Sequence, residues 1–188
     1  MALPLEFISL GAQSIAGVPL RCVPLAEKNP QALYERRLEA ALGSEADYIC
    51  FVDGGEDVCL PGFAEAMAAL ADRGLSLGYA AELVHGLPRG DQRYSRKAFL
   101  RDFSIIHHGV VCRVADLRDI AWPTGCYCWE AIAYGMLAER GCAYDETPRY
   151  DWRPGSGGAR LWPGYTRAVV NSLRWIQGLQ IGAFQRGR

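Results

Sequence analysis

Three acidic residues follow an apolar segment near the middle of the N-terminal half of the chain. The run Tyr48–Val52 is apolar and stops at Asp53, and Glu56 and Asp57 come within the next four residues. A short apolar run bounded by turn residues predicts a buried strand of an α/β sheet. Ligands of open α/β sheets bind beyond the carboxyl ends of the strands. Carboxylates placed there could hold a divalent cation such as Mg²⁺ against substrate phosphates; the alternative is a solvated acidic turn.

The composition indicates one globular domain. The 188 residues are 50% hydrophobic and 22% charged, with a net charge of -1. This length supports a core that needs no disulfide or structural metal. A nearly neutral chain gives no overall argument for binding nucleic acid or membranes. The charge is uneven, however, because the segment from Arg153 onward holds six arginines and no Asp, Glu or Lys.

The cysteines and the N-terminus favour a cytoplasmic protein. The seven cysteines are an odd number in scattered apolar contexts, and no signal peptide or membrane-spanning apolar run is apparent. Reduced, mostly buried thiols are therefore expected. Cys126, Cys128 and Cys142 lack the second pair or the nearby histidine that a zinc site needs.

Apolar periodicity and turn residues predict strands that alternate with helices. Strands are expected over residues 5–10, 19–25, 48–52, 75–84, 105–114 and near 143–144, and helices over 31–43, 62–73, 129–140 and 165–181. The segments 85–97 and 149–158 are expected to be loops that carry binding function. In the strand predicted over 105–114, alternation would point His107 and His108 to opposite faces. This order of elements predicts an α/β fold with a mostly parallel sheet flanked by helices.

Three blocks of sequence, in order, resemble the inverting nucleotide-sugar glycosyltransferases of the GT-A fold, in the large family 2 group. The first block, 29–53, is similar to the family's helix with Ala-Arg-Asn and the strand that ends in Asp-x-Asp-Asp. The second, 105–113, is similar to "Ile-x-His-Pro-x-Val-Met-Phe-Arg-Arg". The third joins Trp129-Glu130 to 136–141 and 150–156, and resembles "Glu-Asp … Leu-Ala-Glu-Arg-Gly … Tyr-Arg-x-His-Pro-Gly-Ser".

The resemblance implies a Rossmann-like GT-A domain, compact and shortened at its N-terminus, over residues 1–158, followed by a basic, aromatic helical tail over 159–188. It implies transfer of a sugar from a UDP-sugar to an acceptor hydroxyl with inversion, assisted by Mn²⁺ or Mg²⁺. Glu130 would be the catalytic base, although an acidic residue that opens a helix is also explained by the helix dipole. The metal ligands implied are Asp53, Glu56 and Asp57.

The resemblance also implies residues on the donor and acceptor sides of the site. Arg36 would lie against the uracil or the diphosphate, and uridine recognition would be rebuilt from small and polar residues of the N-terminal segment. The donor side would comprise Ser9, Gly11, Arg36, Asp53, Tyr150 and Arg153. Possible acceptor-side residues are His107, His108, Trp129 and Asp151.

The sequence departs from the family pattern in ways that leave alternatives open. The acidic motif, Asp53 to Asp57, is one residue longer than Asp-x-Asp-Asp, and Arg153 stands where the family has His. A guanidinium cannot bind a cation but can hold phosphate oxygens. One alternative is a degenerate member that binds a nucleotide without transfer. Another is a glycosyltransferase for modified DNA bases; glycans and lipid-linked glycans are the other acceptors, and the basic tail could contact an anionic surface.

Overall fold

The computed structural model describes residues 4–10, 20–23, 30–53, 58–120 and 129–153. Its strands are β1 (Leu5–Leu10), β2 (Leu20–Val23), β3 (Tyr48–Asp53), β4 (Val58–Cys59), β5 (Leu77–Val84), β6 (Leu87–Pro88), β7 (Val110–Arg113) and β8 (Cys142–Trp152). The helices are α1 (Pro30–Leu42), α2 (Phe63–Ala71), α3 (Arg96–Arg101), α4 (Val114–Arg118) and α5 (Trp129–Arg140), with a 3₁₀ turn over Phe103–Ile105.

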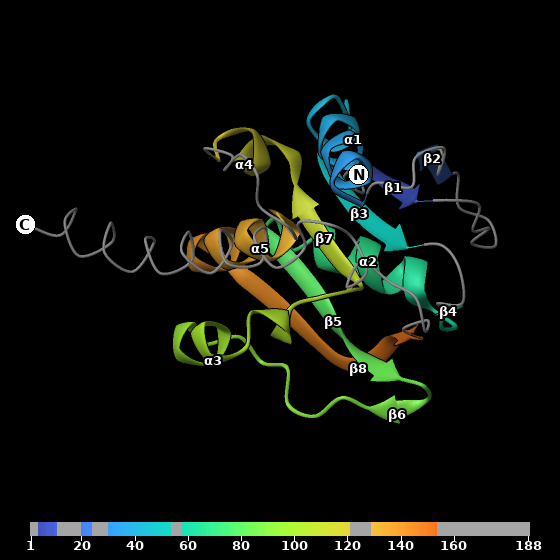
Figure 1. Cartoon of the computed structure of the whole chain (residues 1–188), viewed down its shortest axis with the longest axis vertical. Helices are drawn as coiled ribbons and strands as arrows, with labels where there is room; N and C mark the ends of the chain where they lie inside the picture. Colours follow the sequence, from blue (N-terminus) through green and yellow to red (C-terminus); the bar gives the residue numbers. More distant parts are fainter. Residues whose placement is uncertain (1–3, 11–19, 24–29, 54–57, 121–128, 154–188) are drawn as a thin grey trace, which may run out of the picture.

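A single sheet organises the described residues, in the strand order β2-β1-β3-β7-β5-β8-β4, with β6 paired to β5. Strands β2, β1 and β3 run parallel, and so do β5 and β8, whereas β7 lies antiparallel between the two sets. The arrows of β3 and β5 accordingly point the same way in Figure 1, and β7 points back. The predicted α/β fold with a mostly parallel sheet is confirmed.

Helices cover both faces of the sheet and enclose two apolar clusters. Helices α1, α3, α4 and α5 pack on one face, where Ile49, Phe51 and Ile132 are among the buried residues. Helix α2 packs on the other face through Phe63 and Met67. The strands contribute apolar residues to both clusters, which explains why their sequences are apolar runs rather than alternating patterns.

Most predicted elements are confirmed, but the segment that carries the two histidines is not. The strand expected over 105–114 begins only at Val110, and the 3₁₀ turn precedes it. The side chain of Asp102 caps this turn by accepting a hydrogen bond from the Ser104 amide. Gly109 then has a φ of 60°, which ends any extended run before the strand. His107 and His108 therefore do not alternate along a strand, and that prediction was wrong.

The loop expected over 149–158 is also corrected. Its first residues, up to Trp152, are the end of β8, an 11-residue strand where only a short one near 143–144 was predicted. This end is strand because it pairs on both sides, with β5 through Glu82 and Leu83 and with β4 through Val58 and Cys59. The helix predicted over 165–181 and the tail over 159–188 lie outside the described residues.

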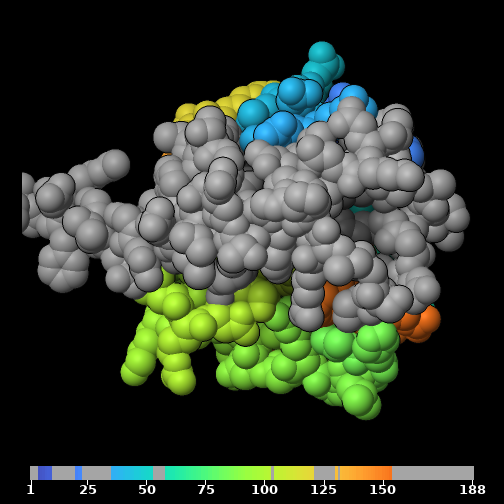
Figure 2. Space-filling view, in the orientation of Figure 1, coloured from blue at the N-terminus to red at the C-terminus, as the bar shows by residue number. Residues whose placement is uncertain are grey.

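The described cysteines are free thiols, but most of them are not buried. Those on β3 and β7 are buried, whereas Cys59 and Cys142 are half-buried and Cys22 is exposed, which corrects the expectation of mostly buried thiols. Among the described helices, none is both long and apolar enough to cross a membrane. Figure 2 shows α1, in blue, and the segment from β6 to α3, in green, exposed at opposite ends of one view.

Gly78 provides a test of the packing between α2 and the sheet. A Cβ atom at this position would lie 2.7 Å from Leu70 Cβ and 2.9 Å from Val111 Cγ1. We expect Gly78→Ala to lower the free energy of unfolding by about 1–3 kcal/mol, because neither backbone can move aside freely. Urea denaturation measures this change. Ala69→Ser, which adds one atom on the exposed side of α2, should change it by less than about 0.5 kcal/mol; equal effects would contradict the packing described.

Candidate active site

Several of the predicted site residues lie where the parallel strands end. Asp53 is the last residue of β3, and β7 runs antiparallel beside this strand with Val110 opposite Phe51. Strands β5 and β8 end at the same edge, with Glu82 beside Tyr150. This edge, called here the carboxyl edge, is where α/β sheets bind ligands.

A buried carboxylate lies at the centre of the carboxyl edge. Glu82 on β5 is 1% exposed. Its Oε2 lies 3.1 Å from His108 Nδ1 and its Oε1 lies 3.6 Å from His107 Nδ1. The Arg89 guanidinium donates a hydrogen bond to Oε1 as well. Both histidines thus direct Nδ1 to one carboxylate, from consecutive positions in the chain.

Neighbouring rings and an amide hold the two histidines in place. The Tyr150 ring stacks on His108 with centroids 4.9 Å apart, and Trp152 meets His107 edge-on at 4.7 Å. Gln92, which is buried, accepts from the Glu82 amide at 2.8 Å and donates to the Ile105 carbonyl at 3.3 Å. The segment before β7 is therefore fastened to β5 through hydrogen bonds and ring contacts rather than through strand pairing.

The surroundings set the charge states of this cluster. Burial by itself favours a neutral Glu82, but the contacts with His107 and His108 outweigh it and hold the pKa of Glu82 well below its usual range. Burial lowers the pKa of His107, and the neighbouring His108 lowers it further. Glu82 is therefore a carboxylate at neutral pH, and His107 is neutral.

Asp151 and Arg153 form a second polar contact at the end of β8. Buried Asp151 accepts hydrogen bonds from the Gly86 amide at 2.8 Å and from Arg153 Nε at 2.9 Å. The Gly86 hydrogen bond and, after it, the Arg153 guanidinium lower the pKa of Asp151. Arg153 keeps 45% of its side chain exposed. Its guanidinium is thus oriented at the carboxyl edge while part of it faces solvent.

Glu130, the predicted base, lies in a buried ion pair. Its Oε1 is 3.2 Å from Nη1 of Arg37, with the two side chains 9% and 5% exposed. The Arg37 guanidinium also lies over the Phe51 ring, 4.5 Å from its centroid. Phe51 is two residues before Asp53, so the Arg37 guanidinium lies over β3 close to the carboxyl end of this strand. The carboxylate of Glu130 is already in contact with this guanidinium.

The other predicted site residues divide into those on the edge and those outside the described structure. Ser9 is buried on β1 beside Val52, one residue short of the end of β3. Asp53 is the last residue of β3, and Trp129 is the first of α5. Arg36 is exposed on α1. Gly11, Glu56 and Asp57 lie outside the described residues.

Sequence reasoning missed Glu82, Arg89 and Arg37. Arg37 had a usable signal, because it precedes the buried Ala40 and Ala41 by three and four residues and so shares their helix face. Glu82 stands alone in a strand buried on both faces, where no alternation marks it. An acid in such an apolar run indicates a buried charge with a partner elsewhere in the chain, since buried charges are paired.

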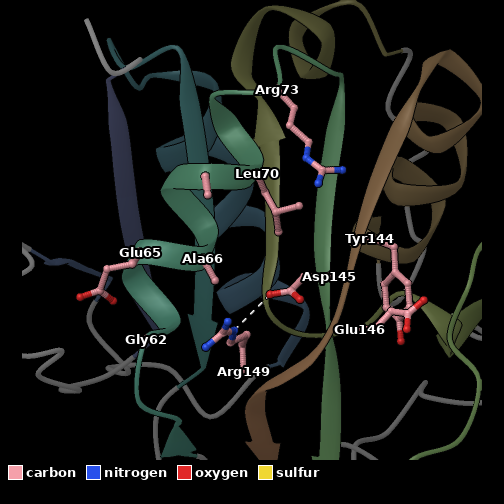
Figure 3. Close-up of a pocket in the computed structure, with 10 residues that line it drawn as sticks. Gly62, Glu65, Ala66, Leu70, Arg73, Tyr144, Asp145, Glu146 and Arg149 are labelled. Atoms are coloured by element: carbon pink, nitrogen blue, oxygen red, sulfur yellow. Dashed lines mark hydrogen bonds and ion pairs between the residues drawn. The ribbon is translucent and has the colours of Figure 1, made fainter.

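A shallow groove of about 540 Å³ lies away from this cluster, between α2 and β8 (Figure 3). Across it, Arg149 donates a hydrogen bond from Nε to Asp145 at 3.1 Å, and Arg73 extends toward β8 from the end of α2. None of the predicted site residues is among the described residues that line it. The groove and the predicted site therefore share no described residue.

The sequence matches no protein-family model and no curated protein. The fold does match solved structures. Residues 1–349 of S. aureus TarS superpose with a TM-score of 0.51 at 16% identity, covering 72% of this chain and 44% of that one. The complex of the same protein with UDP gives 0.52 at 15% identity over 73% and 44%, and the complex with UDP-GlcNAc 0.51 at 12% over 78% and 45%.

The comparison establishes the class of fold. The chain has a Rossmann-like GT-A fold, the fold of nucleotide-sugar glycosyltransferases that the sequence resemblance implied. It spans less than half the length of the TarS structures that it matches. The two complexes show that TarS binds UDP and UDP-GlcNAc.

The buried pair of Arg37 and Glu130 generates a stability prediction. Glu130→Gln should lower the free energy of unfolding by about 3–5 kcal/mol, because it removes the negative charge that the buried guanidinium of Arg37 contacts. The double variant Arg37→Met with Glu130→Gln should recover most of this loss, since both charges of this buried pair are then removed. Chemical denaturation of the two single variants and the double variant measures the coupling. Strictly additive losses would contradict the ion pair.

Proposed function

We propose that this protein is an inverting glycosyltransferase that moves a sugar from a UDP-sugar to an acceptor hydroxyl. The observation that carries the proposal is the gathering of Asp53, Tyr150, Asp151 and Arg153 at the carboxyl edge of a GT-A sheet. The similarity to TarS bound to UDP and to UDP-GlcNAc supports a UDP-sugar as donor.

Arg153 is the proposed contact for the leaving diphosphate. A nucleoside diphosphate leaves more readily when its developing negative charge is neutralised. Asp151 holds the guanidinium through Nε, and Nη2 lies 2.8 Å from the same carboxylate oxygen. Arg153 is also partly exposed, and a guanidinium is suited to hold phosphate oxygens bidentately.

Asp53, Glu56 and Asp57 are the proposed ligands of a divalent cation, Mn²⁺ or Mg²⁺. The described part of this set fits, because Asp53 ends β3 at the carboxyl edge and carboxylate oxygens suit both ions. When bound, the cation would supply positive charge to the donor diphosphate. Ser9 and Arg36 remain proposed donor contacts, and the acceptor side is proposed to include His107, His108 and Trp129.

Glu130 is the proposed base that takes the proton of the acceptor hydroxyl. Glu130 is the second residue of helix α5, and its partner Arg37 lies over Phe51 of β3. A base must lie within hydrogen-bond reach of the hydroxyl. The guanidinium of Arg37 already contacts the carboxylate that would have to accept this proton.

This same ion pair favours a second candidate, a GT-A protein that binds UDP without catalysing transfer. If Arg37 keeps Glu130 engaged, a donor can bind while the acceptor hydroxyl is not deprotonated. The two candidates share the donor site and differ in turnover. Transfer to modified DNA bases and contact of the basic tail with an anionic surface stay predictions from the sequence, because the tail lies outside the described residues.

The donor site is tested by titrating UDP into the protein with and without Mn²⁺ in a calorimeter. We expect binding that Mn²⁺ strengthens, and Arg153→Ala should weaken it about 10- to 150-fold, the value of a charge-assisted hydrogen bond. Arg93→Ala removes an exposed arginine that pairs with Glu146 and should bind UDP like the unmodified protein. Absence of UDP binding under both conditions would overturn both candidates.

Turnover separates the two candidates. With UDP-sugars and candidate acceptors, Asp57→Asn and Glu130→Gln should each reduce the rate of UDP release, by about 10²–10⁴-fold for removal of the base. Circular dichroism must show that Glu130→Gln is folded at the assay temperature, and Glu45→Gln, an exposed carboxylate, is the matched control. UDP binding with neither transfer nor donor hydrolysis in the unmodified protein would select the non-catalytic candidate.

A further inference from the structure

The contacts of Glu82 exceed what its charge requires. One guanidinium, that of Arg89, already compensates this carboxylate, and Arg89 is itself held by a 2.5 Å hydrogen bond to the Ser104 hydroxyl. The two histidines are added to a pair that is neutral without them. Bringing two partly buried imidazoles against this carboxylate has a desolvation cost, so charge compensation alone does not explain the cluster.

One atom of the cluster is buried without a hydrogen-bond partner. His107 Nδ1 has no such partner and lies 3.6 Å from Glu82 Oε1, too far for a good hydrogen bond. A buried polar atom in this state destabilises the fold unless something else satisfies it. The atom points at the carboxylate that His108 also approaches, so whatever satisfies it must fit between these groups.

The spacing of the three side chains matches that of ligands around a single ion. Glu82, His107 and His108 each offer one ligand atom, and these atoms lie within 4.8 Å of one another. Ligands about 2.1 Å from a tetrahedral ion stand roughly 3.4 Å apart. The 3.1 Å separation between Oε2 of Glu82 and Nδ1 of His108 is close to this value.

We propose that Glu82, His107 and His108 form a binding site for a transition-metal dication, with Zn²⁺ as the ion that suits them best. Two imidazoles and one carboxylate are a ligand set for Zn²⁺ and for neighbouring first-row ions, whereas Mg²⁺ prefers oxygen ligands alone. The site is separate in its ligands from the proposed Asp53, Glu56 and Asp57 set. It requires neither a nucleotide nor catalytic activity.

The surroundings hold these ligands ready. Tyr150 and Trp152 fix the planes of the two rings, and Gln92 fixes the backbone of Glu82 against the residues just before His107. Arg89 stays on Oε1 and leaves Oε2 for the ion. Such outer contacts orient ligands and raise metal affinity, commonly by 10- to 100-fold.

Histidine resonances provide the test, because the chain has only three histidines, and the third, His85, is exposed. Zn²⁺ is titrated into the ¹⁵N-histidine-labelled protein without nucleotide. We expect the Nδ1 resonances of His107 and His108 to shift together at one equivalent and those of His85 to stay unchanged. Mg²⁺ should shift none of them. The seven cysteines do not confuse this measurement, since it reports on imidazole nitrogen.

Variants then measure the contribution of each ligand by calorimetry. His107→Ala and His108→Ala should each weaken Zn²⁺ binding by about 100-fold. Loss of a ligand should cost at least as much affinity as loss of a residue that only orients a ligand. His85→Ala is the matched control and should bind like the unmodified protein. Unshifted His107 and His108 resonances, or equal affinity in His107→Ala, would overturn the site. If a variant does not fold, the labelled unmodified protein decides alone, and failure of UDP binding would leave this result intact.

Discussion

The buried negative charge of Glu82 constrains the region around it more than any other feature of the described structure. A carboxylate that leaves water must be compensated by close charges and hydrogen bonds. Its partners come from segments that pass the end of β5: Arg89 from the loop after the strand, and His107 and His108 from the residues before β7. The chain between β5 and β7 folds back on the sheet, and this brings all three side chains to the carboxylate.

The same principle operates at the other side of the edge, where Glu130 and Arg37 join α5 to α1 above Phe51. The two apolar clusters hold the helices on the sheet, and the charged contacts join α5 to α1 and the segment before β7 to β5. A polar site within an otherwise apolar interior is therefore already organised before a ligand arrives. Organisation of this kind lowers the cost of ordering side chains on binding.

Local sequence patterns predicted the elements that are governed by burial and by turn residues. The apolar runs of β1, β3 and β5 and the glycines after α1 and α5 placed these strands and helices correctly. The pattern failed at His107 and His108, which lie in an apolar segment that reads as a strand. There the capped 3₁₀ turn and the positive φ of Gly109 break the extended run, and both rings face one carboxylate.

The sequence by itself determined the α/β alternation and the position of Asp53 at the end of a buried strand, because both follow from contacts between near neighbours. The tertiary structure decided which charged groups meet. Glu82 pairs with His108 across 26 residues and Glu130 with Arg37 across 93. It also buried Arg37 and left Arg36 exposed, through the rotation of α1 on the sheet. Such pairings depend on strand order and helix packing, which local spacing does not specify.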